Sequence, residues 1–248
     1  MYVAHPVTQT LRILDASPAP VPSPAALDEV RAIWEREKRE RPGLYNGRLF
    51  SLERFRGDDA VGFLADYSWH VAQQRRPELY EELRVRPLAV SGLMVAGGHM
   101  LFGRRKTSLA IEGGLWEAPP SGTIPGDLRE PDGSISWRKV FLEELREELG
   151  LDLQASLDTS GAHRLLRPFA LIENTATNIW ELGVALELDI DHREVLAAWA
   201  ATPKPEHNEM AAVPLEDVPR FHKERHADND MVGVCGMLLA QYGVIPAP

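Results

Sequence analysis

The sequence predicts an α/β fold in which a mixed β-sheet lies between helices. Apolar runs over Pro87–Val95 and Met100–Arg104 are separated by a Gly-Gly pair, a pattern typical of a hairpin. Two further segments, Leu165–Glu173 and Asn178–Asp189, are β-rich and frame a polar turn. Between these strand pairs lies Glu143–Leu151, whose leucines recur at helical spacing. Strands and helices in this order favour helices on both faces of one sheet.

The helix expected over Glu143–Leu151 is strongly acidic. Glu144, Glu147 and Glu148 stand at i, i+3 and i+4, so three carboxylates share one face and repel one another. A cation offsets such repulsion, and hard divalent ions such as Mg²⁺ are held by a few carboxylates together with substrate phosphates. The simpler interpretation, a solvated acidic face, is the commoner fate of a glutamate-rich helix. Gly150 supplies the stop that ends the helix.

The other elements are predicted from periodicity and turn residues. We expect strands over Thr8–Leu14, Leu49–Phe55 and Met210–Leu215, and helices over Asp28–Arg39, His192–Ala200 and Asp230–Tyr242. The last of these helices is expected to take Cys235 into the core. An aromatic segment holds Tyr67, Trp69 and His70, which we assign to core packing, with contact to a base or sugar as the alternative.

Composition and charge narrow the class of protein. The 248 residues carry a formal net charge of −10, and no Lys/Arg block is set among aromatics, which argues against nucleic acid as a partner. Cys235 is the single cysteine, so an internal disulfide cannot form. No apolar run approaches the roughly twenty residues of a membrane span. Residues 1–12 lack the charged start and apolar core of a signal peptide, so we expect a soluble cytoplasmic protein without a membrane partner.

Two stretches in sequence order resemble the Nudix hydrolase superfamily. Glu144–Leu151 matches the second half of the Nudix box, Glu-U-x-Glu-Glu-x-Gly-U with U aliphatic, without a gap. Upstream, Leu115–Asp127 resembles the family's strand and loop, which ends in Pro-Gly-Gly and then Pro-Gly-Glu. The resemblance implies a Nudix α/β/α sandwich with a mixed sheet over residues 86–248. Residues 1–85 are then an N-terminal α/β extension.

The first half of the box departs from the family pattern. Asp127 stands where the family has Glu and arrives one residue early, residues 129–136 lengthen the loop, and Glu143 replaces the box Arg. In the family that Arg pairs with the early Glu and braces the loop. Here the brace must differ, and its candidate carboxylates are those of Asp127 and Glu143. The candidate cationic partners are Arg138, Lys139 and Arg146.

The resemblance also implies a metal centre. It makes Glu144, Glu147 and Glu148 the ligands of one or more Mg²⁺ or Mn²⁺ ions, with the backbone carbonyl near Gly122 as a further ligand. Such ions shield the charge of a pyrophosphate and lower the pKa of a bound water, which attacks one phosphorus in line. A general base must reach that water. Nudix enzymes often take the base from a late loop, which favours Glu206 here, with Glu147 and Glu148 as competitors.

Substrate contacts follow from position and from a narrower resemblance. Arg104 and Arg105 end a strand that often faces the substrate in Nudix enzymes; an exposed edge strand protected by charge is the equal alternative. Short similarities resemble UDP-glucose and UDP-galactose diphosphatases, which implies a nucleoside diphosphate partner and the products UMP and a sugar 1-phosphate. Asn174 and Glu181 then lie near the site, whereas His207 is expected to be solvated. These similarities are Ala32–Glu35, Asp66-Tyr67 and Ile172–Thr175.

Two other functions stay open. The Nudix family includes isopentenyl diphosphate isomerases, which use a cysteine in the site, and the distance of Cys235 from the box in sequence weighs against this function. The family also includes non-catalytic domains that bind a nucleotide or effector. The missing box Arg and the early Asp127 favour a binding module, whereas the retained ligand glutamates weigh against one. The sequence does not decide between a monomer and a homodimer.

Overall fold

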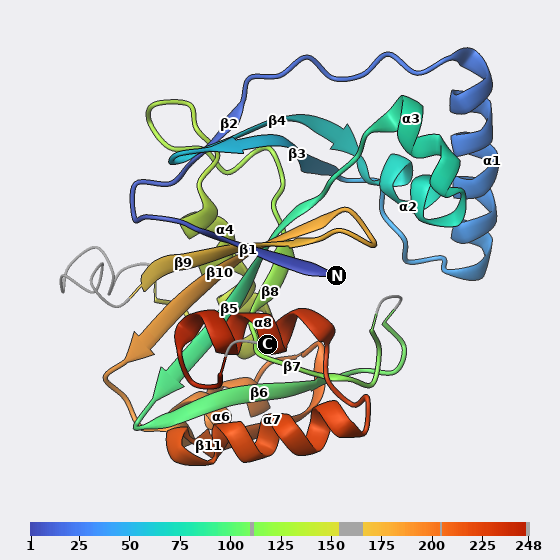
Figure 1. Ribbon diagram of the computed structural model, residues 1–248. Coiled ribbons are helices and arrows are strands. Elements are labelled where there is room, and N and C mark those ends of the chain that lie inside the picture. Colours follow the sequence, from blue (N-terminus) through green and yellow to red (C-terminus); the bar gives the residue numbers. More distant parts are fainter. Residues whose placement is uncertain (110–111, 154–165, 204, 247–248) are drawn as a thin grey trace.

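The computed structural model describes residues 1–109, 112–153, 166–203 and 205–246 (Figure 1). The helices are α1 (Pro24–Glu40), α2 (Tyr67–Arg75), α3 (Tyr80–Leu83), α4 (Trp137–Leu149), α6 (His192–Ala200), α7 (Val218–Ala227) and α8 (Gly233–Tyr242). The strands are β1 (Tyr2–Pro6), β2 (Arg12–Asp15), β3 (Arg48–Arg56), β4 (Asp59–Asp66), β5 (Leu88–Ala96), β6 (His99–Arg105), β7 (Trp116–Glu117), β8 (Ser121–Thr123), β9 (Leu166–Asn174), β10 (Ile179–Leu188) and β11 (His207–Pro214).

A large mixed sheet organises the chain and runs in the order β1-β9-β10-β5-β6-β11. β10 lies parallel to β5, whereas β9 and β10, β5 and β6, and β6 and β11 pair antiparallel. The predicted hairpin is confirmed: Gly97 and Gly98 join β5 to β6 with φ of 53° and 74°, a backbone region that glycine adopts readily. Beyond this turn β5 and β6 diverge. The short strands β8 and β7 pair with β5 and β6 there, which places Gly122 and Glu117 in the middle of the sheet.

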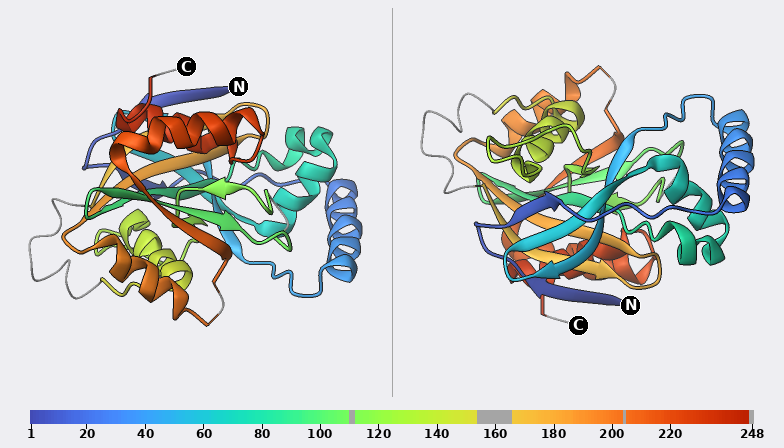
Figure 2. Two further views of the ribbon diagram at one scale, coloured as in Figure 1. Left: turned by 90° about the horizontal axis from the view of Figure 1, so that it is seen from below. Right: turned by 90° about the horizontal axis from the view of Figure 1, so that it is seen from above.

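Helices cover both faces of the large sheet (Figure 2). Alternate residues of β5 point to opposite faces, as strand geometry requires. Leu88, Val90 and Met94 belong to the core cluster that contains α4 and α6, whereas Leu93 belongs to the cluster that contains α7 and α8. The predicted α/β/α architecture with a mixed sheet is confirmed.

Helix α4 carries the acidic face and is anchored by its other side. Ser136 caps its start, because its hydroxyl accepts the backbone N–H of Lys139 at 3.2 Å. Leu145 and Leu149 are fully buried in the core. Gly150, with φ of 69°, ends the helix in the left-handed conformation that the sequence predicts. Anchoring by the leucines fixes the direction in which the glutamates point.

The first third of the chain forms a second sheet, β2-β4-β3, flanked by α1, α2 and α3 (Figure 1). Its contacts with the rest of the chain are extensive. β1 joins the large sheet beside β9, and Ile13 and Phe50 belong to the same core cluster as Leu145. The backbone N–H of Phe50 also donates to the carbonyl of Ile124 at 2.8 Å. The division of the chain at residue 85 stays a prediction.

Several elements differ from the sequence prediction, and β2 and α7 are examples. The strand expected over Thr8–Leu14 is β2, which begins only at Arg12 and ends at Asp15. Helix α7 was not expected, because its one buried residue, Val218, leaves too little apolar periodicity to detect. Among the residues described, none of the helices combines the length and apolar character that crossing a membrane requires.

Candidate functional site

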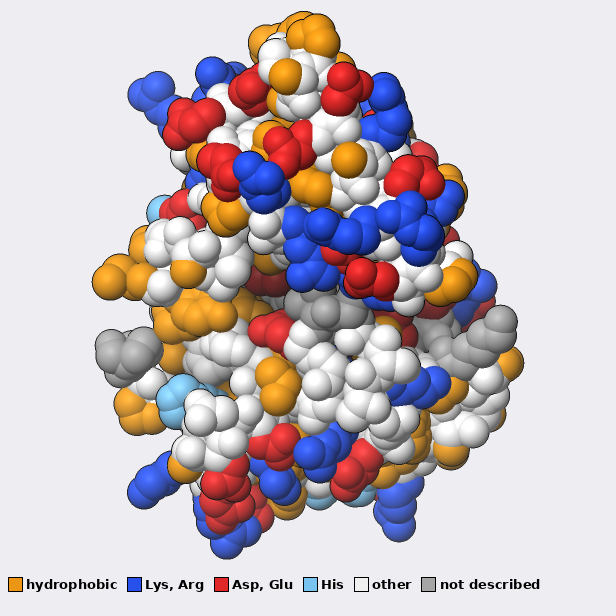
Figure 3. Space-filling model, turned by 90° about the vertical axis from the view of Figure 1, so that its right-hand side faces the viewer, with side chains coloured by type: hydrophobic (Ala, Val, Ile, Leu, Met, Phe, Trp, Pro, Cys, Tyr) orange, Lys and Arg blue, Asp and Glu red, His pale blue; other side chains and the backbone are white. Residues whose placement is uncertain are grey.

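A cavity of about 390 Å³ opens between α2 and the large sheet. Figure 3 views the molecule from the right-hand side of Figure 1 and shows a hollow with acidic side chains at its edge. Ser91 and Glu181 line it from β5 and β10, and Tyr67 and His70 line it from α2. Arg105 contributes a positive charge to the lining. The carboxylates of the lining are those of Glu112, Glu117, Glu181 and Glu206. An acidic cavity of this kind suits a ligand that arrives with cations or with several hydrogen-bond donors.

Glu144 lies against the wall of this cavity. A Cβ atom at Gly122 of β8 would stand only 1.9 Å from Oε1 of Glu144, so the absence of a side chain at Gly122 makes room for the carboxylate. Burial, followed by the negative charge of Glu147, raises the pKa of Glu144 to about 8. The structure therefore brings Gly122 and Glu144 together and places a carboxyl there that favours a proton or a cation.

Glu148 follows one turn along α4 and is only 2% exposed. Its Oε1 accepts the backbone N–H of Ser121 at 2.9 Å, whereas its buried Oε2 has no hydrogen-bond partner among the described residues. Burial, followed by the negative charge of Glu117, raises the pKa of Glu148. Buried polar atoms are almost always paired, so the free Oε2 marks a place for a further group.

His207 lies beside Glu148, and the expectation that it is solvated is wrong. Its side chain is 0% exposed because β11 begins at this residue and pairs it with Arg105, which turns the ring inward. Nε2 stands 2.8 Å from Oε1 of Glu117, and Nδ1 stands 3.9 Å from Oε2 of Glu148. The ring covers Gly103 so closely that a Cβ there would approach its Cδ2 to 2.4 Å.

The two adjacent arginines of β6 point in different directions. Nη1 of Arg105 lies 2.7 and 2.6 Å from the two carboxylate oxygens of Glu117, and its side chain is 15% exposed. Arg104 instead donates to Asp230 at 3.1 Å and to the carbonyl of Gly114 at 3.0 Å. Successive side chains of a strand alternate between faces, which explains the difference. Arg105 lines the cavity, and Arg104 lies outside this lining.

Glu206 and Glu147 occupy exposed positions at the site. Glu206 lines the cavity just before β11, and its charge contributes to the raised pKa of both Glu144 and Glu148. The side chain of Glu147 is 62% exposed and forms an ion pair with Arg146 at 3.4 Å. Glu147 therefore lies at the solvent edge of the acidic face, whereas Glu144 and Glu148 lie inside it.

Of the other two predicted substrate contacts, one borders the cavity. Glu181 accepts a hydrogen bond from the hydroxyl of Ser91 at 2.5 Å, and burial raises the pKa of Glu181 to about 7. Asn174 ends β9, and its side chain accepts the backbone N–H of Ala176 at 3.1 Å. Asn174 therefore stabilises the turn before β10 and lies outside the cavity lining.

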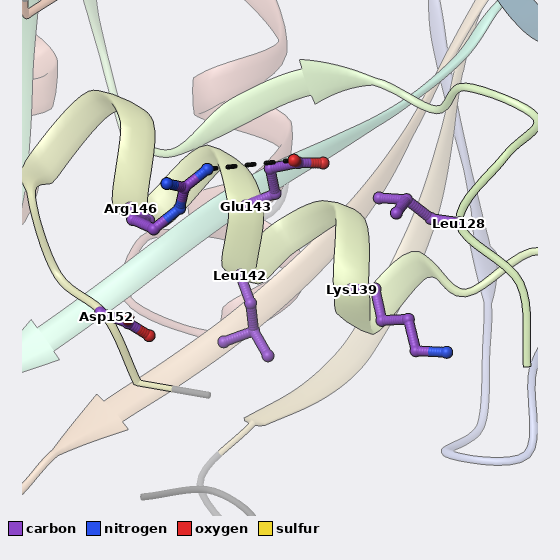
Figure 4. A pocket seen from close by; sticks show the side chains of 6 residues that line it. All are labelled: Leu128, Lys139, Leu142, Glu143, Arg146 and Asp152. Carbon is purple, nitrogen blue, oxygen red and sulfur yellow. Dashed lines mark ion pairs between the residues drawn. The ribbon is translucent and has the colours of Figure 1, made fainter. Parts of the chain in front are cut away.

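The long loop before α4 has its own brace, and Figure 4 shows one side chain that contributes to it, Lys139. On the outer face of α4, Glu143 and Arg146 point toward each other, with a closest approach of 4.0 Å. Lys139 in the first turn donates to the backbone carbonyl of Arg129 and lies 3.7 Å from a carboxylate oxygen of Glu130. Of the proposed cations, Lys139 thus ties the loop, and Arg146 pairs with Glu143 on the helix itself.

The residues present fit a divalent cation. Glu117, Glu148 and His207 each offer one ligand atom, and these atoms lie within 4.8 Å of one another. Glu144 adds a carboxylate from the same helix face as Glu148. Oxygen ligands suit Mg²⁺ and Mn²⁺, and the unpaired Oε2 of Glu148 is a free ligand atom for such an ion.

Sequence reasoning did not place Glu117 at the site and expected His207 to lie in solvent. The two residues are 90 positions apart, and only the pairing of β6 with both β7 and β11 brings them together. A signal was present at Glu117, because an acidic residue between Trp116 and Ala118 interrupts an otherwise apolar segment. For His207 no comparable signal exists in the polar segment around it.

Comparisons with known proteins give remote similarities. No family model matches the sequence, and no curated protein matches it. Among solved structures, DR0079 from Deinococcus radiodurans shares 17% identity over 79% of this chain and 99% of its own, with a TM-score of 0.47. A bifunctional NMN adenylyltransferase/ADP ribose pyrophosphatase from Francisella tularensis shares 13% identity, with a TM-score of 0.45, and the match covers 72% of this chain but only 46% of that protein.

A third structure is a NUDIX hydrolase from Alicyclobacillus acidocaldarius. It shares 13% identity over 65% of this chain and 92% of its own, with a TM-score of 0.39. Similarity at this level assigns neither a family nor an activity to the chain.

Proposed function

We propose that the chain is a Nudix hydrolase that cleaves a pyrophosphate bond in a nucleoside diphosphate derivative with the help of Mg²⁺ or Mn²⁺. One observation carries the proposal: α4 directs Glu144 and Glu148 against Gly122 and Ser121 at the wall of an acidic cavity. These residues belong to the two stretches that resemble the Nudix box. Carboxylates with raised pKa values, held on one helix face, suit a cation that accompanies a diphosphate.

The residues of the chain have distinct roles in this proposal. Glu144 and Glu148 are the metal ligands inside the site, and Glu147 is a further ligand at its solvent edge. The backbone near Gly122 offers a carbonyl oxygen as another ligand. When bound, the ion neutralises phosphoryl charge and lowers the pKa of a water. Glu206 is the general base of choice, because its exposed carboxylate lines the cavity and its charge acts on Glu144 and Glu148. Glu147 and Glu148 remain competitors.

The substrate class proposed is a nucleotide sugar such as UDP-glucose, which gives UMP and a sugar 1-phosphate. Its support is the cavity lining, where carboxylates such as Glu181 accept hydrogen bonds from sugar hydroxyls. Arg105 supplies a positive charge in the cavity lining that attracts the diphosphate. Tyr67 of α2 offers an aromatic surface against which a base can stack. Arg104 and Asn174 stay predicted contacts of the substrate, although neither lines the cavity.

The isoprenoid diphosphate alternative depends on a reactive cysteine. Cys235 is 2% exposed in α8, and burial raises the pKa of its thiol to about 12. A thiol in that state is inert near neutral pH, which favours hydrolysis over cysteine-dependent isomerisation. The binding-module alternative predicts a ligand that is held but not cleaved, and only a turnover assay separates it from an enzyme.

The test is hydrolysis of UDP-sugars, ADP-sugars, ADP-ribose and dinucleoside polyphosphates with Mg²⁺ or Mn²⁺. Products are followed by ³¹P NMR in ¹⁸O-water, which identifies the phosphorus that water attacks. Glu144→Gln and Glu148→Gln are expected to lower turnover by about two orders of magnitude or more. Glu143→Gln is the matched control, because Glu143 is half-exposed on the outer face of α4 and pairs with Arg146. Full turnover in Glu148→Gln, or none in the wild type with any substrate, contradicts the proposal.

A further inference from the structure

Two buried atoms of the site face each other without a hydrogen-bond partner among the described residues. They are Nδ1 of His207 and Oε2 of Glu148, which lie 3.9 Å apart. Their side chains are 0% and 2% exposed, so bulk water does not reach them. Leaving a buried polar atom unpaired costs about 1 to 3 kcal/mol, so a pair of such atoms requires an explanation.

The neighbours of His207 decide which ring nitrogen carries the hydrogen. Nε2 lies 2.8 Å from Oε1 of Glu117, and Nη1 of Arg105 donates to the two oxygens of the same side chain at 2.7 and 2.6 Å. A carboxylate only accepts hydrogen bonds, so Nε2 donates. In the neutral ring Nδ1 then presents a lone pair to Glu148. This orientation is the one in which a carboxylate holds a histidine that ligates a metal ion.

The distance of 3.9 Å between Nδ1 of His207 and Oε2 of Glu148 leaves room for one bound ion or water molecule between them. A direct hydrogen bond does not span it, since 3.9 Å exceeds the upper limit of about 3.2 Å. Two ligand bonds of about 2.1 Å each reach up to about 4.2 Å. A water molecule also fits this span, but the surroundings favour a cation, because Glu117, Glu148 and His207 each offer a ligand atom and these atoms lie within 4.8 Å of one another.

We propose that His207 Nδ1 and Glu148 Oε2 ligate one divalent transition-metal ion, with Glu117 and Arg105 as the residues that position the ring. The inference rests on the proposed function only for the presence of a metal ion. It adds a nitrogen ligand to a centre that the sequence predicts to consist of oxygen ligands alone. Imidazole is a favourable ligand for Zn²⁺ and Co²⁺, and the transition metal Mn²⁺ accepts it beside oxygen ligands more readily than Mg²⁺ does. The site therefore prefers transition metals.

The experiment is electron spin-echo envelope modulation of Mn²⁺ added to the full chain without substrate. We expect ¹⁴N modulation from a directly bound imidazole, replaced by the ¹⁵N pattern when the protein is made with ¹⁵N-histidine. This isotope exchange shows on the wild type whether a histidine ligates the ion, independently of whether any variant folds. Mn²⁺ bound without histidine modulation overturns the inference.

Variants add a second, quantitative arm. His207→Gln is expected to abolish the modulation and to weaken Mn²⁺ binding by about 10- to 100-fold, with a much smaller effect on Mg²⁺. His70→Gln is the control, because His70 is a buried histidine of the same cavity and does not belong to the group formed by Glu117, Glu148 and His207. If the His70→Gln variant loses the modulation and His207→Gln keeps it, the ligand is misassigned.

The outcomes separate this inference from the proposed function. Mn²⁺ binding without a histidine signal, together with turnover of a nucleoside diphosphate derivative, removes the imidazole ligand and leaves the hydrolase. Absence of both metal binding and turnover removes both.

Discussion

Replacing Glu181 with Gln is predicted to stabilise the protein at alkaline pH relative to acidic pH. Glu181 lies at the cavity, where it accepts a hydrogen bond from Ser91 at 2.5 Å. Burial raises the pKa of its carboxyl from 4.5 to about 7. Glutamine has nearly the same shape, keeps an oxygen that accepts from Ser91, and carries no titrating proton. The substitution therefore isolates the cost of ionising this carboxyl inside the folded protein.

The sign follows from proton linkage. Between pH 4.5 and about 7 the folded protein holds a proton on Glu181 that the unfolded chain has lost, so the free energy of unfolding falls as pH rises through this window. At about 1.4 kcal/mol per pKa unit, the difference between about 7 and 4.5 corresponds to about 3 kcal/mol. Because the carboxyl borders the cavity and its water, we expect about 1 to 3 kcal/mol.

The assay is urea unfolding, followed by tryptophan fluorescence, at pH 5 and pH 8.5 in the presence of EDTA. The free energy of unfolding of Glu181→Gln is expected to rise relative to the wild type by about 1 to 3 kcal/mol between the two pH values. Glu216→Gln is the control, since Glu216 is an exposed carboxyl near α7. A wild-type-to-variant difference that is equal at both pH values refutes the reasoning about Glu181.

Three further predictions concern α4 and the core. Gly122→Ala is expected to displace the Glu144 carboxylate and to weaken Mn²⁺ binding at least about 10-fold in calorimetry. Gly43→Ala, which fills open space, is the control and is expected to leave Mn²⁺ binding unchanged. Equal Mn²⁺ binding by the two variants contradicts the contact between Gly122 and Glu144. Ser136→Ala is expected to lower the free energy of unfolding by about 1 to 2 kcal/mol in urea, and no change excludes the cap. Cys235→Ala is expected to keep wild-type turnover, and a loss of activity that is not matched by unfolding points to a catalytic thiol.

The parts of the fold that depend on local pattern were predictable. Helix α6 begins and ends at the expected residues, and α4 ends at Gly150 as predicted, because periodicity and stop residues act within a few positions. Strand β1 escaped detection, since its five residues are never fully buried and show no alternation. Its partner, β9, lies more than 160 positions later in the sequence, and only that pairing defines it.

In the candidate site, too, the features that depend on local pattern were predictable, and those that depend on strand pairing were not. The position of Glu144 and Glu148 on one face of α4 was predictable from their spacing, whereas their role as metal ligands stays a prediction. Their orientation toward Gly122 and Ser121 depends on which strand α4 covers, which no local pattern gives. The pair of Glu117 and His207 depends on the register of β7 and β11 on β6, where a shift of one residue would turn either side chain to the opposite face.

The most direct test of the account is an anomalous difference map from crystals grown with Mn²⁺. We predict a peak at bonding distance from the carboxylates of Glu144 and Glu148, on the cavity side of Ser121 and Gly122. No peak at saturating Mn²⁺, or a peak bound only by exposed surface carboxylates, contradicts the claim that this helix face is a metal centre.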